Sequence, residues 1–252
     1  MSSIPIKTPA ELDKMRAAGR VVGLLLKALY EKVRPGVSTE ELDAFARGFI
    51  QDHGATPAFL GYHGYPSSIC ASINEQVVHG IPGPRRLVEG DIIGVDVGAV
   101  LNGYVGDAAR TYAVGKVAAE TQRLLDATRD SLDAGIAAAR HNGHVQDIGA
   151  AVQALAEKAG YGVVRDFVGH GIGKRMHEPP QVPNYGQRGL GPKLKAGMTL
   201  AIEPMVNAGT HQVDVLDDGW TVVTRDKRLS AHFEDMVIIT QGDPEILTRL
   251  DR

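Results

Sequence analysis

The chain has 252 residues, a mass of 26.9 kDa, a net charge of −3 and a pI near 6.3, which fit one large domain or two small ones. The near-neutral charge and the lack of a basic stripe argue against a nucleic-acid or membrane-surface protein, since both kinds of binding need clustered positive charge. The single cysteine, Cys70, excludes an internal disulfide framework and fits a reducing compartment, and no apolar run reaches the roughly 18 residues that span a bilayer.

Two helices are predicted near the N-terminus, and each begins with a capping box. Thr8 is the expected N-cap of the first helix, with Pro9 at the first helical position and Glu11 closing the box. Apolar residues then recur at steps of three and four to about residue 33. Ser38 is the expected N-cap of the second helix, which should end near residue 52.

The segment 56–83 is aromatic, Gly-rich and irregular, with one expected strand at 67–73. A loop with so many apolar groups is typical of a lid or of a pocket wall. Further along the chain, two more helices are expected at 119–140 and 145–159. The last third should consist mostly of strands, which we expect at 162–168, 199–204, 220–224 and 231–240.

A β-hairpin is predicted at residues 91–112, with its turn at Asn102-Gly103. With a two-residue turn, paired positions sum to 205, so Asp96 and Asp107 become diagonal neighbours on one face of the ribbon. The two carboxylates would then be close enough to share ions. A turn one residue longer would break this parity, and both acids would then be ordinary residues flanking a turn.

An internal repeat is visible in two ten-residue strings, LVEGDIIGVD at 87–96 and LKAGMTLAIE at 194–203. The interval of 107 positions between them also relates Gly36 to Gly143, each of which precedes an expected helix. Two similar halves would place Asp96 and Glu203 at related positions about a pseudo-two-fold axis. The alternative is a chance match between short strings that contain glycine.

Two more local patterns suggest metal ligands. His170 lies among glycines in VGHGIG at 168–173, and Glu234 lies at the start of an apolar strand. With Asp96, Asp107 and Glu203 they make one imidazole and four carboxylates, a set that suits a pair of divalent ions such as Mn, Fe, Co or Zn. Two such ions would also balance four negative charges. Any one of these residues alone is more often structural than a ligand.

Together these motifs resemble the type I methionine aminopeptidases of the short bacterial kind, which belong to the pita-bread-fold metallopeptidases. The resemblance spans nearly the whole chain, including GYHGYP at 61–66, NEQVVHGIP at 74–82 and MHEPPQ at 176–181. It implies an α+β fold, with two pseudo-symmetric halves whose helices pack on a curved antiparallel β-sheet. It also implies one catalytic domain over residues 1–252.

The resemblance also implies roles for individual residues. Two divalent ions, of Co, Mn, Fe, Zn or Ni, would be bound by Asp96, Asp107, His170, Glu203 and Glu234. The ions would activate a water molecule for attack on the first peptide bond, with Glu203 moving the proton. His177 and His79 would contact the reacting amide from two sides.

The resemblance further implies an apolar pocket for a methionine side chain. Its walls would be Tyr62, Tyr65, Cys70 and Trp220, with Phe59 and Met176 at the rim. The alternative for the tyrosines and the tryptophan is ordinary core packing, the commoner fate of an aromatic residue. Phe59 stands where a cysteine is common in the best-known bacterial pattern, and Met176 stands where a phenylalanine is common. Bulk at position 59 would narrow the entrance and shift the preference for the residue that follows methionine.

The implied activity is removal of the N-terminal methionine when the next residue is small. The implied partners are the N-termini of nascent polypeptides and, transiently, the ribosome; we expect a cytoplasmic monomer with no specific nucleic acid or membrane partner. One alternative is a proline-specific aminopeptidase or dipeptidase, although such enzymes usually carry an extra N-terminal domain, for which we expect no room before the helix at residue 9. Another is a non-catalytic binding module with the same fold.

Overall fold

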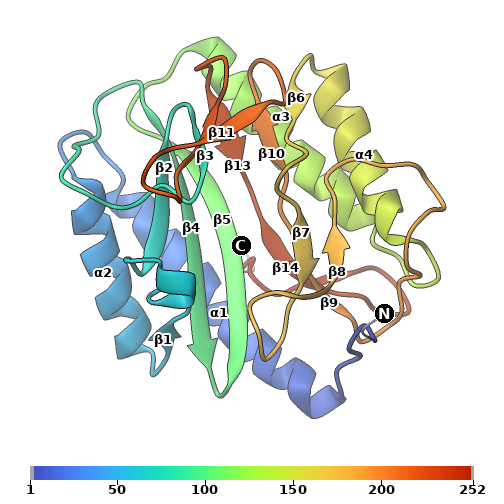
Figure 1. Ribbon diagram of the computed structural model, residues 1–252. Coiled ribbons are helices and arrows are strands. Elements are labelled where there is room, and N and C mark those ends of the chain that lie inside the picture. Colours follow the sequence, from blue (N-terminus) through green and yellow to red (C-terminus); the bar gives the residue numbers. More distant parts are fainter. Residues whose placement is uncertain (1–2, 251–252) are drawn as a thin grey trace.

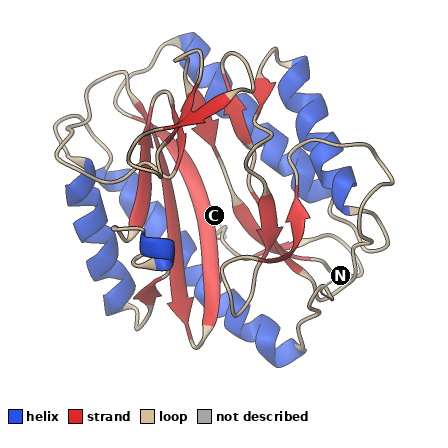
Figure 2. Ribbon diagram, viewed as in Figure 1, coloured by secondary structure: helices blue, strands red, loops and turns tan. Residues whose placement is uncertain are grey.

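Four long helices surround the strands from behind and at the left and right edges in the view of Figure 1, two for each half of the molecule. The computed structural model describes residues 3–250. Figure 2 shows the strands gathered on the other side of the helices, in curved antiparallel sheets. The result is the α+β arrangement of two halves that was expected from the sequence. The helices are α1 (Pro9–Lys32), α2 (Thr39–Asp52), α3 (Ala119–Ala138) and α4 (Val145–Lys158).

The first two helices begin as predicted. In α1 the Thr8 hydroxyl accepts from the Glu11 amide, and the Glu11 carboxylate accepts from the Thr8 amide. Ser38 and Glu41 form the same reciprocal pair at the start of α2. Each box satisfies amide groups that a helix leaves without an internal partner at its N-terminus. The apolar side of α1, including Leu25, is buried against the first half of the sheet.

The predicted hairpin is confirmed, and its register is the expected one. β4 (Ile92–Leu101) and β5 (Tyr104–Ala113) form an unbroken antiparallel ladder in which Asp96 pairs with Ala109 and Asp107 pairs with Gly98. Asn102 and Gly103 make the turn with φ of 53° and 76°, the left-handed conformation that a two-residue hairpin turn requires. The two aspartates therefore share one face of the ribbon.

The strands of the second half are shorter and more broken than predicted. The strand expected at 162–168 is reduced to β6 (Gly162–Val163). The strand expected at 199–204 ends as β9 (Thr199–Ile202), before Pro204, which has no amide hydrogen to continue the ladder. The strand expected at 231–240 is split into β13 (Ser230–His232) and β14 (Asp235–Ile238).

The split has a physical cause in the hydrogen bonds of the two residues between β13 and β14. The Phe233 amide donates to the Pro204 carbonyl, but the next amide, that of Glu234, donates to the Ala109 carbonyl on β5. The chain thus leaves its pairing with β10 (Met205–Asn207), contacts the other half, and then pairs with β9. Periodicity along one segment does not reveal such a change of partner.

The remaining short elements complete the sheets. β2 pairs with β4, β12 pairs with β3, and β7 lies between β8 and β9. The strand predicted at 67–73 corresponds to β2, and the one at 220–224 to β12. The bounds are β1 (Thr56–Pro57), a 3-10 turn (Tyr62–Gly64), β2 (Ile69–Ile73), β3 (Gln76–Val78), β7 (Gly169–Gly171), β8 (Glu178–Val182), β11 (Val213–Val215), β12 (Val222–Thr224) and β15 (Glu245–Ile246).

The internal repeat corresponds to matching contacts in the two halves. Gly36 donates its amide to the Leu87 carbonyl. In the second half the donor to the carbonyl of Leu194, the residue related to Leu87, is Asn142, one residue before the position related to Gly36. The residues that cap α2 and α4 form isolated β-bridges with Arg86 and Lys193, respectively. Each half therefore ties the start of its second helix to the segment that leads into its central strand.

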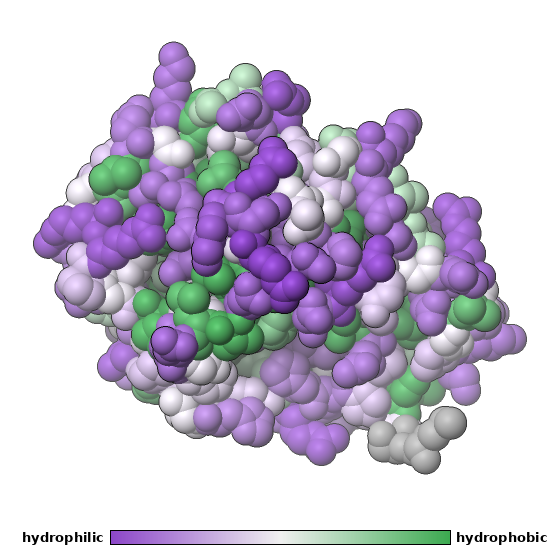
Figure 3. Space-filling view, turned by 45° about the horizontal axis from the view of Figure 1, so that its top comes forward, coloured by the Kyte–Doolittle hydropathy of each residue, from purple (hydrophilic) through white to green (hydrophobic). Residues whose placement is uncertain are grey.

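The outer surface is mostly polar in the view of Figure 3, with smaller hydrophobic patches between the hydrophilic side chains. Among the described residues, no helix is both long and apolar enough to cross a bilayer.

Candidate metal centre

One cavity of about 420 Å³ collects every residue for which the sequence predicted a role at the site. Its lining combines carboxylates and imidazoles with an apolar wall. The predicted residues in the lining are Phe59, Tyr62, Tyr65, Cys70, His79, Asp96, Asp107, His170, Met176, His177, Glu203, Trp220 and Glu234. The cavity is also lined by His63, Val78, Phe167 and Val168, to which the sequence analysis gave no role.

Asp96 and Asp107 enter the cavity from the hairpin of the first half. Asp107 lies on β5, opposite Gly98, so that no side chain from the paired position on β4 fills the space beside it. Its carboxylate is buried, with only 4% of the residue exposed. The register of the ribbon places the two acids on one face, where their charges repel unless a cation or a proton lies between them.

His170 comes from β7, at a bulge in its pairing with β8. The flanking glycines are needed there, because a Cβ at Gly169 or Gly171 would collide with the carbonyl oxygens of Ala201 and Pro179. The imidazole Nδ1 lies 2.9 Å from the Gly171 carbonyl, which can only accept, so Nδ1 carries the proton. Nε2 is therefore the nitrogen with a free lone pair.

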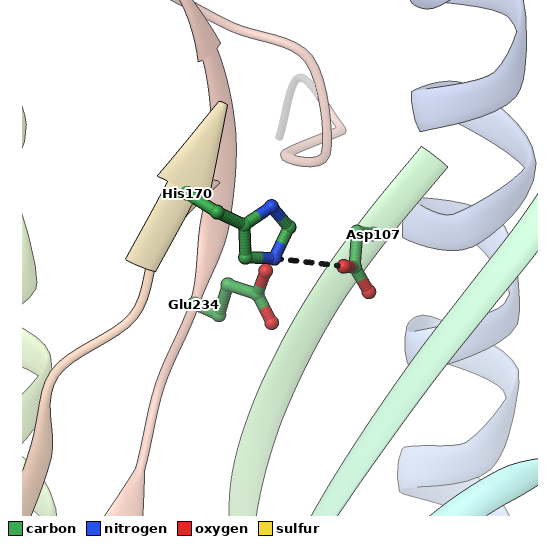
Figure 4. Close-up of side chains that lie close together, drawn as sticks. All are labelled: Asp107, His170 and Glu234. Atoms are coloured by element: carbon green, nitrogen blue, oxygen red, sulfur yellow. Dashed lines mark ion pairs between the residues drawn. The ribbon is translucent and has the colours of Figure 1, made fainter. Parts of the chain in front are cut away.

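Glu203 and Glu234 follow the ends of β9 and β13, at the two breaks described above. Nε2 of His170 lies 3.4 Å from Oε1 of Glu203 and 3.7 Å from Oδ2 of Asp107. Figure 4 shows that the side chains of Asp107, His170 and Glu234 converge from three different strands or strand ends. One ligand atom from each of these three residues lies within 4.8 Å of the others, a spacing that suits a shared metal ion.

The carboxylates of this cluster lack the partners that buried charges need. Within residues 3–250, Asp96 Oδ1, Asp107 Oδ1 and Glu234 Oε1 are buried and have no hydrogen-bond partner. Burial raises the pKa of Asp96 to about 7, and burial with the neighbouring carboxylates raises the pKa of Asp107 well above its usual range. Such oxygens are unfavourable in isolation and fit divalent ions, which would replace both the protons and the missing donors.

The imidazoles are held in the neutral form. Burial lowers the pKa of His170 and of His79 to about 4, and burial also lowers that of His177. A neutral imidazole can act as a metal ligand or as a hydrogen-bond donor near neutral pH. His177 Nδ1 shares a hydrogen bond of 2.7 Å with the Tyr62 hydroxyl, which fixes the orientation of its ring.

The apolar wall lies beside these polar groups. The Tyr65 hydroxyl lies 3.1 Å from the Ile69 carbonyl and 3.0 Å from the Gly80 carbonyl and shares its one proton between them, so only the ring is left to line the cavity. Its ring meets that of Trp220 edge to face, with centroids 5.1 Å apart. Cys70 is buried on β2, directly opposite Asp96. The aromatic residues therefore do both things that the sequence left open, because they pack with one another and also bound the cavity.

A charged network behind Glu234 was not predicted. Arg110, on β5, donates to the Glu234 carbonyl and at 2.6 Å to the Asp235 carboxylate. Arg249 donates at 2.7 Å to the other oxygen of Asp235, which is completely buried. The acid and the two arginines are far apart in the sequence, and no local pattern links them. Phe167, which is half-buried in the cavity wall, follows the charged residues Arg165 and Asp166, and no local pattern predicted its position there.

Comparisons with known proteins agree with this geometry. Residues 13–241 match the model of metallopeptidase family M24. The chain is 53% identical to a methionine aminopeptidase of Clostridium perfringens and 50% identical to methionine aminopeptidase 1 of Bacillus subtilis, with at least 97% of each chain aligned. It superposes on the crystal structure of a methionine aminopeptidase from Rickettsia prowazekii with a TM-score of 0.96 and 45% identity, over 98% of this chain and 100% of that one. A prolidase from Pyrococcus furiosus shares the fold, with a TM-score of 0.77 and 24% identity over 98% of this chain and 66% of that one.

Proposed function

The chain belongs to metallopeptidase family M24 and, within it, to the methionine aminopeptidases, and from this premise we propose that its cleft removes the N-terminal methionine when the second residue is small. The observation that carries the proposal is the near-complete alignment at 44–53% identity with bacterial methionine aminopeptidases. The substrates are the N-termini of nascent polypeptides. The convergence of carboxylates and an imidazole beside an apolar wall supports a metal-dependent cleavage of this kind.

The protein binds divalent metal, and we propose that it holds two ions. Asp96, Asp107, His170, Glu203 and Glu234 are the proposed ligands, and their four carboxylates would balance the charge of two divalent ions. Co, Mn, Fe, Zn and Ni all suit this mixture of oxygen and imidazole nitrogen ligands. When bound, such ions supply Lewis-acid stabilisation of a developing oxyanion and lower the pKa of a water molecule towards about 7.

The chain's own residues would then position the substrate and move the protons. Glu203 is largely enclosed beside His170, with 14% of its side chain exposed, and we propose that its carboxylate takes a proton from the attacking water and passes it to the departing amine. His177, oriented by Tyr62, would donate a hydrogen bond to the reacting carbonyl oxygen. His79 would contact the amide nitrogen from the other side of the cavity.

The methionine side chain would enter the apolar part of the cavity. Flexible thioethers pack well against aromatic rings, and sulfur contacts with ring edges are favourable. The proposed wall consists of Tyr62, Tyr65, Cys70 and Trp220, with Phe59 and Met176 at the rim. Phe59 and Met176 both lie close to Gly98, where an added Cβ would be 2.6 Å and 3.1 Å from their side chains, so their positions depend on that glycine.

We further propose that residues 1–252 form a single catalytic domain, of which the structure describes residues 3–250. The protein would act as a cytoplasmic monomer that associates transiently with the ribosome, where nascent N-termini appear. A proline-specific activity is not favoured, because the matches to two prolidases and to an Xaa-Pro dipeptidase are at 22–24% identity and support only the fold. A binding module without activity is not favoured either, because all five proposed ligands are present.

Peptide cleavage distinguishes these functions. We expect the chelated protein to be inactive, and protein reloaded with Co or Mn to release methionine from Met-Ala-Ser but to leave Ala-Pro-Ala intact. Cleavage of Ala-Pro-Ala would support the proline-specific alternative, and no cleavage of either peptide by the metallated protein would support the binding module.

Two histidine variants test the proposed roles at the reacting amide. His79→Ala and His177→Ala should each lower kcat by about a hundredfold, the usual scale for a positioned donor. Their metal content should remain that of the wild type, because neither residue is a proposed ligand. Unchanged turnover in either variant would refute the role assigned to that histidine.

A further inference from the structure

His232 is a buried imidazole beside the site, and nothing described so far uses it. It lies on β13, where it pairs with Met205 on β10, and only 3% of the residue is exposed. Within residues 3–250, its Nε2 atom is buried and has no hydrogen-bond partner. A buried polar atom without a partner is unfavourable, so an imidazole at this position needs a compensating interaction.

The nearest acid to this nitrogen is Glu203, whose Oε2 atom lies 3.9 Å from Nε2 of His232. The other oxygen of the same carboxylate, Oε1, lies 3.4 Å from Nε2 of His170. The carboxylate is therefore flanked by two imidazoles, one at each oxygen. His170 lines the cavity, whereas His232 is not part of the lining and approaches from the strand pair β10–β13.

We propose that His232 is a positioning residue that donates its Nε2 proton to Oε2 of Glu203. This inference rests on the proposed function, because it assigns His232 a role through Glu203. The hydrogen bond would hold Oε2 and keep Oε1 directed towards His170 and the cavity. The present distance is longer than a hydrogen bond, and a movement of about 1 Å closes it; such contacts in ligand-free sites often tighten when the site is filled. Outer partners of this kind orient metal-ligating side chains.

Matched variants test the donor itself. His232→Leu removes the donor, whereas His232→Gln keeps an amide hydrogen of similar reach. Val206→Ala is the control, because Val206 is a fully buried residue of the same strand pair, opposite Ala231, and packs in the core on the side of α3 and α4. Each variant is compared with the wild type by thermal unfolding, by titration of the metal-free protein with Mn²⁺, and by kcat and KM for Met-Ala-Ser.

We expect His232→Leu to weaken Mn²⁺ binding and to lower kcat, each by about ten- to a hundredfold, with KM changed by less than about twofold. His232→Gln should restore both properties to within about threefold of the wild type. Val206→Ala should lower the unfolding temperature and leave both properties unchanged. The proposal is overturned if His232→Gln is as impaired as His232→Leu, or if His232→Leu only lowers the unfolding temperature, as the control does.

Side-chain ¹⁵N NMR of the metal-free protein, assigned by the loss of one imidazole in His232→Gln, provides a readout that does not involve activity. We expect His232 in the tautomer protonated at Nε2, and a crystal structure with Zn²⁺ should show Nε2 within about 3.2 Å of Oε2. An unprotonated Nε2, or Nε2 at about 2.0–2.1 Å from the ion, would overturn the proposal by making His232 a ligand or a bystander. If the wild type failed to cleave Met-Ala-Ser, the proposed function would fail while the titration and NMR would still decide the role of His232.

Discussion

The two halves of the molecule supply their site residues in different ways. Asp96 and Asp107 stand on one hairpin, whose two strands pair without interruption from Ile92 to Ala113. His170, Glu203 and Glu234 come from a bulge and from the ends of two short strands. A hairpin with a tight turn is specified by residues that are close in the sequence, whereas the second set depends on contacts between distant segments. The first half therefore presents a preformed pair of carboxylates, and the second half has to be held in place.

Side chains outside the cavity do this holding. Asn184 donates at 3.0 Å to the Glu203 carbonyl, and Arg110 donates to the Glu234 carbonyl. Asp235, next to Glu234, accepts from Arg110, Arg249 and Thr248. This contrast predicts that a change in the hairpin affects either metal binding or local stability. A change in the contacts behind the second half should affect both metal binding and stability.

The largest effect is expected from Asp107→Asn, which removes one of the two proposed metal ligands on the hairpin. Activity should fall by at least about a thousandfold, because a metal centre contributes several kcal/mol of transition-state stabilisation. The metal-free variant should be at least as stable as the metal-free wild type, because a carboxyl group whose ionisation is unfavourable at this buried position has been replaced by a neutral amide. Activity and unfolding temperature after chelation measure the two effects. Asp217→Asn, in the exposed turn before β12, is the control and should change neither.

The next effect is expected from Asp235→Asn, behind the second half. Removing a fully buried acid leaves Arg110 and Arg249 without their shared partner, which should cost about 3 kcal/mol of unfolding free energy. Metal affinity should fall by about ten- to a hundredfold, because Glu234 is adjacent. Urea unfolding and Mn²⁺ titration measure these changes. Asp133→Asn removes only the exposed partner of Arg249 and should cost less than about 1 kcal/mol. Equal effects of the two variants would contradict the role of the buried acid.

A smaller effect is expected from pH in the metal-free protein, where both sets of carboxylates meet. The unfolded chain loses these protons near pH 4, whereas Asp96 in the folded protein holds its proton to about pH 7. A raised pKa in the folded state means that stability is lost as pH rises between these values. With chelator present, the unfolding temperature should be lower at pH 8 than at pH 5 by about 5 °C, or roughly 2 kcal/mol. Saturating Mn²⁺ should remove the difference; an unfolding temperature that rose with pH in chelator would contradict repulsion and burial of the carboxylates as its cause.

The smallest effect is expected from Gly103→Ala in the hairpin turn. The residue has a φ of 76° and open space around its Cα, so an added methyl group strains only the backbone, by about 1 kcal/mol. Chemical unfolding should detect this loss, while kcat and metal affinity should match the wild type. Gly90→Ala, which also has a positive φ and open space but lies outside the hairpin, is the matched control. If Gly103→Ala lost metal binding and Gly90→Ala did not, the strand pairing of the hairpin would need the glycine turn to keep its register.

The same contrast explains what could be predicted from the sequence. The capping boxes at Thr8 and Ser38 and the register of the hairpin follow from neighbouring residues, and the structure has them as predicted. The four acids and His170 could be grouped as a possible metal site from their residue types, but the gathering of the other predicted residues with them in one cavity was expected only because the motifs together resemble a known family. The break at Glu234 was missed, because it arises when an amide changes partner from β10 to β5.

The position of His232 behind Glu203 could not be predicted either. Its cross-strand pairing with Met205 depends on where β10 begins after Pro204, and the expected strand at 199–204 gave no sign of that restart. The Arg110–Asp235–Arg249 network was also beyond prediction, because ion pairs between distant segments leave no periodic pattern.

The hydrogen bond from the Glu234 amide to the Ala109 carbonyl joins the two halves directly beside the proposed ligands. A chain cut in the exposed connection around Gly115, between β5 and α3, would yield one fragment with two of the proposed ligands and one with three. Each fragment would carry only part of the proposed ligand set and would bind the ions more weakly than the intact cleft. Divalent cations should therefore drive reassembly of the fragments, and chelation should reverse it. In that case the bound metal ions would stabilise the association of the two fragments.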